Sequence, residues 1–166
     1  MTLRQPNFLE KLGSLVPGYR GYADRETRRT ADQRLRARVG VILDEAKADL
    51  NTVINQLTAA NRLGDINAVE TLRKRVGSCA DSIRNVQHGG SGLMDSTVVK
   101  AGDLDKVYQH DLGLHEQANA VAAAVRAVNV DAVDETAKAA QKAADAMQRA
   151  ITARDAILEE VFQCPS

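Results

Sequence analysis

The residues best suited to chemistry lie close together, between positions 108 and 115. Asp111 and His115 are four residues apart, so they share one face of a helix. Asp111 also interrupts an apolar pattern, and a half-buried Asp beside a His can act as a tuned general base. Catalysis would also need a nucleophilic or electrophilic partner, and the sequence does not point to one. We therefore predict a structural polar cluster of Tyr108, Asp111 and His115, with catalysis as the alternative.

A buried carboxylate needs a partner of opposite charge, and the sequence contains a stretch rich in arginine. Arg28 and Arg29 lie in that stretch, on a helix that the pattern places next to the one carrying Asp111. Buried carboxylates are most often paired with such a group. We therefore predict that Asp111 pairs with Arg28 or Arg29.

A metal site can be tested on the same residues. Bundles that bind two iron ions use inward-facing Glu residues and Glu-x-x-His motifs, and this chain has no Glu-x-x-His. His110 and His115 are five residues apart and point in different directions on a helix. His88, at a predicted loop, could join them, but the spacing favours no known site. We expect no metal, no cofactor and no catalytic residue.

The arginine-rich stretch also predicts an interaction surface. At 100° per residue, Arg25, Arg28, Arg29 and Arg36 fall on one helix face with Asp32 in its middle. Nucleic acid would favour uninterrupted positive charge and interleaved aromatic residues, so we expect no nucleic-acid partner. We instead predict a protein-contact surface made of Tyr19, Tyr22, Arg25, Arg28, Arg29 and Arg36.

Charge is unevenly distributed along a chain whose 22 basic and 22 acidic residues balance. Residues 1–40 carry a net charge of +5 and residues 101–166 a net charge of −5. Such an asymmetry can indicate an acidic partner, a membrane surface or nucleic acid. We expect the simpler case, in which the two ends attract each other in the fold.

Residues 5–16 form a short amphipathic segment. Its apolar face consists of Phe8, Leu9, Leu12 and Leu15, and Lys11 lies beside that face. This face either covers the core of the protein or lies at an anionic lipid surface. Burial of Phe8 and Leu12 against the rest of the chain would count against the lipid hypothesis.

The elements that position these residues are all helical, because apolar residues recur every three or four positions and no strand pattern occurs. We predict an elongated antiparallel bundle of four main helices with a short N-terminal amphipathic helix. Residues 1–23 form an N-terminal arm that includes a turn at 16–19, and residues 24–166 form a single bundle. Asp24 is the expected N-cap of the first long helix, Gly64 its end and Asp65 the next cap. The helices are expected at about 25–63, 66–87, 103–129 and 131–162, with a glycine-rich loop at 88–102.

Cysteine and alanine usage favour a tightly packed interior. Cys79 falls in an apolar seam, so we expect a buried small side chain rather than a reactive thiol. Alanine is dense from residue 118 onward, and alanine lets helix backbones approach closely. Close packing there argues against a cofactor between the last two helices.

Two stretches of the sequence resemble a family of bacterial all-helical proteins with no known activity. The first is Pro-Gly-Tyr-x-Gly-Tyr at 17–22, followed by the Glu26, Arg28 and Arg29 step. The second consists of SGLMD at 91–95 and LDKVYQHDL at 104–112. The resemblance implies a coherent helical fold in which the arm, the loop and the start of the helix near 103 belong together. It implies no mechanism.

Composition limits the function classes. A hydrophobic fraction of 44% with 27% charged residues excludes a disordered chain. No apolar run is long enough to span a membrane, and no secretory signal is evident, so we expect a cytoplasmic protein. We predict a non-enzymatic scaffold or adaptor that contacts a protein partner or itself. The alternatives are a peripheral protein at the inner membrane face that uses the arm, and an enzyme or metal protein that uses Asp111 and His115.

Overall fold

The protein is described by a computed structural model over residues 7–85 and 99–162, and these residues contain five α-helices and no strand. A short helix precedes four long ones, so the predicted all-α class is confirmed. The helices are α1 (Phe8–Leu15), α2 (Arg25–Ala59), α3 (Leu63–Arg84), α4 (Ala101–Arg126) and α5 (Val133–Phe162).

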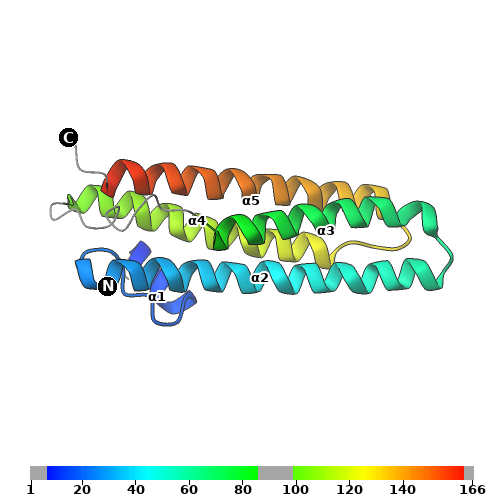
Figure 1. Cartoon of the computed structure of the whole chain (residues 1–166), viewed down its shortest axis with the longest axis horizontal. Helices are drawn as coiled ribbons and strands as arrows, with labels where there is room; N and C mark the ends of the chain where they lie inside the picture. The colour runs from blue at the N-terminus through cyan, green and yellow to red at the C-terminus, as the bar shows by residue number, and fades with distance from the viewer. Residues whose placement is uncertain (1–6, 86–98, 163–166) are drawn as a thin grey trace, which may run out of the picture.

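The four long helices form two hairpins packed side by side (Figure 1). Helices α2 and α3 are antiparallel, as are α4 and α5, while α4 runs in the same direction as α2. Helix α3 packs on α2 and α5, and α4 also packs on α2 and α5. The order around the bundle is therefore α2, α3, α5, α4, with antiparallel pairs inside each hairpin and parallel pairs between them.

The apolar seams predicted from the sequence line the interior of the bundle. Their burial removes apolar surface from water, which is the main favourable term in folding. Val53, Leu104 and Val161 are half-buried, and Ala60 at the end of its seam is exposed. The buried seam residues are Leu35, Val39, Ile42, Ala46, Leu50, Leu57, Val69, Leu72, Val76, Cys79, Ile83, Val107, Leu114, Ala118, Val121, Val125, Val128, Val133, Ala137, Ala140, Ala144, Met147, Ile151 and Leu158.

Cys79 is a buried side chain between α3 and α5, as its position in the seam predicts. Its Sγ lies 3.5 Å from the carbonyl oxygen of Ala144, a distance that requires close approach of the two backbones. Burial raises the pKa of the Cys79 thiol, so the protonated form is favoured. Small residues on α5 make this approach possible.

The connection between α2 and α3 differs from the prediction. Helix α2 ends at Ala59 rather than near residue 63, and Asn61 has a φ of +55°. The N–H of Arg62 donates to the carbonyl of Leu57 at 2.8 Å, and the N–H of Asn61 donates to that of Thr58 at 3.0 Å. These two bonds define a Schellman motif with Asn61 in the left-handed position. Gly64, expected there, lies inside the first turn of α3 instead.

Other helix ends shift by a few residues. Asp24 is the N-cap of α2 as predicted, and its side chain accepts from the N–H of Glu26 at 3.0 Å. Helix α4 begins at Ala101 rather than at residue 103 and ends at Arg126 rather than near 129. Helix α5 begins at Val133 rather than at 131. Most of the predicted 88–102 loop and the predicted end of the third helix lie outside the described residues.

Helix α3 is much shorter than α2, so it covers only part of it. The last carbonyl of α3, at Arg84, accepts from Nη1 of Arg36 at 3.2 Å, and the Arg84 side chain pairs with Asp44. Residues of α2 before Arg36 therefore lie beyond the end of α3. Among the described residues, that end of the bundle consists of α2, α4 and α5, with the arm on its outside (Figure 1).

Candidate functional site

The arm reaches the bundle through a short helix and two turns. Helix α1 begins with a capping box, in which the Asn7 side chain accepts from the N–H of Glu10 and the Glu10 carboxylate accepts from the N–H of Asn7. The predicted turn follows, with Gly18 at a φ of +79° and the N–H of Tyr19 donating to the carbonyl of Val16. Gly18 therefore takes the left-handed third position of this turn.

A buried ion-pair network lies where the arm meets the three-helix end. Nε of Arg154, on α5, donates to Oδ1 of Asp111, on α4, at 2.6 Å. Nη2 of Arg154 donates to Oδ1 of Asp32, on α2, at 2.6 Å. The Asp111 and Arg154 side chains are both 0% exposed. One guanidinium thus ties together three helices.

Two tyrosines of the arm donate further hydrogen bonds to Asp111. The hydroxyls of Tyr19 and Tyr22 each donate to Oδ2 of Asp111 at 2.7 Å. Nη2 of Arg154 donates to the hydroxyl of Tyr22 at 3.1 Å. The hydroxyl of Tyr108, on α4, accepts from the backbone N–H of Tyr22 at 2.9 Å. The rings of the three tyrosines contact one another, with centroids 5.8 to 6.4 Å apart.

Two arginines of α2 flank this network. Nε of Arg28 donates to the backbone carbonyl of Tyr22 at 2.8 Å, and its guanidinium lies 5.2 Å from the centre of the Phe162 ring. A cation over an aromatic face is attracted by the ring quadrupole. Arg36 pairs with Oδ2 of Asp32 at 2.8 Å. Both oxygens of Asp32 therefore face guanidinium groups.

Burial and charge shift the titration of the network. Burial, followed by the charge of Asp111, raises the pKa of Tyr19 and of Tyr22 far above the ordinary tyrosine range. Burial opposes the charge of Arg154, but Asp111, Tyr22 and Asp32 outweigh it and hold the pKa of Arg154 well above its ordinary value. The tyrosines are therefore neutral donors and Arg154 a cation at physiological pH.

His115 is buried one helical turn from Asp111 but does not join the network. Its Nδ1 lies 3.2 Å from Nδ2 of Asn119, and its Nε2 has no hydrogen-bond partner among the described residues. Burial, followed by the charge of Arg38, lowers the pKa of His115. Of the predicted cluster, the structure joins Tyr108 and Asp111 through the arm and leaves His115 apart.

The predicted partner of Asp111 is corrected by the structure. The Asp111 carboxylate binds Arg154, Tyr19 and Tyr22, while the Nε of Arg28 is used by the carbonyl of Tyr22. Arg154 lies between Ile151 and Leu158 in the three-and-four spacing of apolar residues along α5. The informative pattern was present in the sequence, because Asp111 and Arg154 are opposite charges at seam positions of neighbouring helices.

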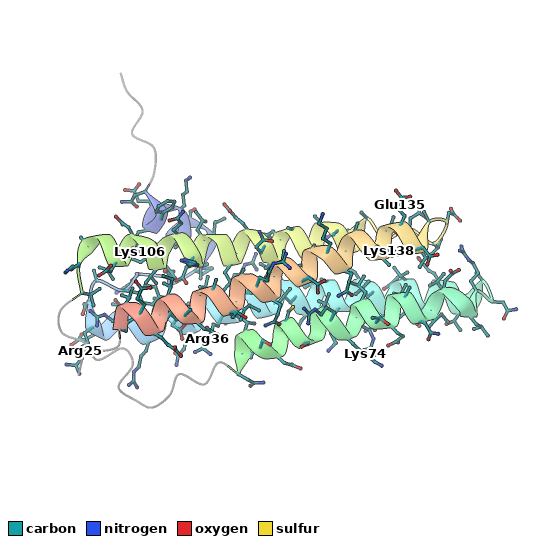
Figure 2. The ribbon with its side chains drawn as sticks, turned by 90° about the horizontal axis from the view of Figure 1, so that it is seen from above. Arg25, Arg36, Lys74, Lys106, Glu135 and Lys138 are labelled. Atoms are coloured by element: carbon teal, nitrogen blue, oxygen red, sulfur yellow. The ribbon has the colours of Figure 1, made fainter. Side chains whose placement is uncertain are left out.

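Only part of the predicted interaction surface is exposed in the structure. Tyr19, Tyr22 and Arg28 are buried, so they form no surface. The reason is that the arm folds back onto α4 and carries its tyrosines into the interior. The remaining predicted residues stay accessible at this end of the bundle: Arg25 and Arg29 are exposed and Arg36 is half-buried (Figure 2 labels Arg25 and Arg36).

The apolar face of α1 is divided in the same way. Leu12 is fully buried and Leu9 is half-buried against the core. Phe8 and Leu15 are 37% and 40% exposed. The alternative in which this face covers the core therefore holds for Leu12 and in part for Leu9, because α1 packs on α4.

The described residues offer few other sites. They contain no group of three His, Cys, Asp or Glu side chains placed to hold a metal ion. None of the helices in the described ranges combines the length and apolar character needed to cross a bilayer. The tyrosines at 19 and 22 contact the tyrosine and aspartate at 108 and 111, whereas the 91–95 stretch lies outside the described residues.

Comparison with known proteins gives no further assignment, since no family model, no curated protein and no solved structure matches the chain. The fold and site together define a four-helix bundle with a buried ion-pair network that fastens an N-terminal arm.

Proposed function

We propose that the protein is a non-enzymatic helical scaffold or adaptor, which acts by contact of its outer surface with a protein partner or another copy of itself. The observation that carries the proposal is the closure of the Asp111 cluster. Asp111 is 0% exposed, and its two oxygens are bound by Arg154 and by two tyrosine hydroxyls. A general base must come within hydrogen-bond reach of a substrate proton, and this fully buried carboxylate, with a donor on each oxygen, is closed to a substrate.

Exposed hydrophobic side chains on the outer surface support the same proposal. Large hydrophobic side chains are exposed on three separate helices of the described chain: Phe8 and Leu15 on α1, Val41 on α2 and Leu63 on α3. They lie on a bundle whose interior is filled by its own seams. A rigid frame with exposed apolar side chains is suited to recognition by another surface.

Light scattering across protein concentration, combined with photo-crosslinking in cells, tests the proposal. A photoreactive residue replaces Val41 or Leu63, both exposed, so that folding is unaffected. We expect either a defined multimer or one discrete cross-linked partner at one of these positions. A monomer at every concentration with no discrete cross-linked species would contradict the scaffold.

The enzymatic alternative makes a different prediction for His115→Ala. An activity lost in that variant, with the free energy of unfolding unchanged, would favour an enzyme. A change in stability alone would support the scaffold, because His115 is buried beside Asn119. The original chain and the variant are compared at equal concentration.

A further inference from the structure

Helix α1 lies as a ridge on the outside of the bundle, against α4 (Figures 1 and 2). Phe8 and Leu15 are seven residues apart, so they fall on the same side of this helix. They are 37% and 40% exposed, although Leu12 between them is fully buried. The ridge therefore presents two large apolar side chains to the outside without leaving the bundle.

Positive side chains surround this ridge. Lys11 lies between Phe8 and Leu15 along α1 and is exposed. A Cβ at Gly18 would lie 3.3 Å from Nε of Arg34, so Arg34 rests against the turn that follows α1. The charge of Arg38, one turn further along α2, acts on His115 of α4.

These cations and Arg20 form no ion pair within the described ranges. All four side chains are exposed: Lys11, Arg20, Arg34 and Arg38. Glu10 is the single acid of α1, and its carboxylate accepts from the N–H of Asn7 in the capping box. Glu116, whose charge also acts on His115, is a second acid, so the four cations outnumber the two acids placed here.

We propose that this ridge docks on an anionic lipid surface, with Phe8 and Leu15 entering the headgroup region and the four cations facing lipid phosphates. This inference goes beyond the proposed function, because a lipid surface is neither a protein partner nor another copy of the chain. A partner helix prefers a groove, whereas a convex ridge of apolar side chains flanked by cations fits a flat anionic interface. Of the two residues whose burial would count against lipid contact, Leu12 is buried and Phe8 is 37% exposed, so only a shallow, charge-dependent contact is proposed.

Vesicle flotation tests the proposal with the full chain. We expect the protein to float with vesicles of equal parts phosphatidylcholine and phosphatidylglycerol, to remain behind with pure phosphatidylcholine, and to lose binding as salt rises. Arg34→Gln with Arg38→Gln should weaken binding by about 25-fold, since each cation near the surface contributes about fivefold. Phe8→Ser with Leu15→Ser should reduce it by at least roughly tenfold.

Matched controls come from the opposite end of the bundle. Leu63 is 61% exposed, and Lys138 lies exposed at that end, far from α1 (Figure 2). Leu63→Ser and Lys138→Gln should leave flotation unchanged. Tyrosine fluorescence checks folding of every variant, because all three tyrosines of this tryptophan-free chain lie in the buried network.

The outcomes separate this inference from the proposed function. Absence of flotation with anionic vesicles, or equal losses in the ridge variants and the controls, would overturn the lipid surface. If the Phe8 and Leu15 variant instead breaks a multimer seen by light scattering, the ridge binds protein, and the scaffold stands without the lipid. The scaffold proposal is tested separately, by the crosslinking experiment at Val41 and Leu63.

Discussion

A guanidinium and two carboxylates inside a bundle of this size are costly to desolvate, by several kcal/mol per ion. The cost is offset only when geometry is good and the remaining lone pairs are used. Arg154 meets Asp111 and Asp32 at 2.6 Å each, and the second oxygen of each carboxylate also has a donor. Removal of one partner would leave a buried charge uncompensated, so the network is far more sensitive to substitution than exposed pairs are.

Alkaline pH provides a test at the tyrosines. The pKa values of Tyr19 and Tyr22 are raised in the folded chain, whereas an unfolded tyrosine titrates near about 10. The unfolded state therefore loses these protons first. The stabilising contribution is complete below about pH 10 and is lost progressively as pH rises above it.

Urea unfolding between about pH 8 and 11, with phenolate absorbance recorded in parallel, measures this loss. We expect the phenols of Tyr19 and Tyr22 to ionise only as the chain unfolds. Above about pH 10, the unfolding free energy of Tyr22→Phe should fall less steeply with pH. The difference in slope should correspond to about one proton. Ionisation of Tyr19 and Tyr22 near about pH 10 in a chain that is still folded would show that they are not held as described.

The sequence predicted part of this site. A charged residue in an apolar seam indicated that Asp111 is buried and paired, and that much is observed. The partner was predicted wrongly because Arg28 and Arg29 were chosen by their density in the sequence, while Arg154 stands alone in the seam of α5. The role of Tyr19 and Tyr22 depends on the arm folding back across 86 to 92 residues of chain, which no local pattern specifies.

At the scale of elements, the arm depends on a glycine at its second turn. Gly21 has a φ of +86°, and a Cβ there would lie 2.5 Å from the hydroxyl oxygen of Tyr108. This position thus needs both left-handed backbone and absence of a side chain. Gly113, in the middle of α4, is different, because a Cβ there would meet nothing within 4 Å.

A pair of alanine substitutions separates the two cases. We expect Gly21→Ala to destabilise the chain by more than about 1 kcal/mol, through backbone strain and displacement of Tyr108. Gly113→Ala should stabilise it by about 0.5–1 kcal/mol through helix propensity. Thermal unfolding followed by circular dichroism measures both. A stabilising Gly21→Ala would show that the arm does not pack against Tyr108.

Helix identities followed from periodicity, but their ends did not. The predicted stop at Gly64 relied on glycine as the usual left-handed residue, whereas Asn61 takes that position. Asparagine also tolerates this conformation, since its short polar side chain bonds locally. The sequence contains both residues within four positions, and propensity alone ranks glycine first. Packing of α3 on α2 decides between them.

At the scale of the whole molecule, the charge gradient along the chain does not explain the buried ion pair between Asp32 and Arg154. The charge gradient predicts attraction between basic residues 1–40 and acidic residues 101–166. The buried pair between these regions has the opposite sense, with the acid Asp32 in the first region and the base Arg154 in the second. Net charge of a segment gives the average field, whereas burial at a seam position selects individual charges.

We expect the buried network to join the arm and three helices into one unit that unfolds cooperatively. A catalytic carboxylate usually costs stability, so its removal tends to be neutral or stabilising. Removal of a structural carboxylate instead lowers the free energy of unfolding. The exposed pair between Asp44 and Arg84 supplies a matched comparison, since those side chains are 49% and 41% exposed.

The most direct measurement is urea unfolding of the original chain, Asp111→Asn and Asp44→Asn, followed by tyrosine fluorescence and by circular dichroism. The tyrosines report the network and the dichroism reports all helices, so coincident transitions in the original chain would indicate one unit. We predict that Asp111→Asn loses about 3–5 kcal/mol of unfolding free energy and Asp44→Asn less than about 1 kcal/mol. Equal, small losses in both variants would contradict the central claim.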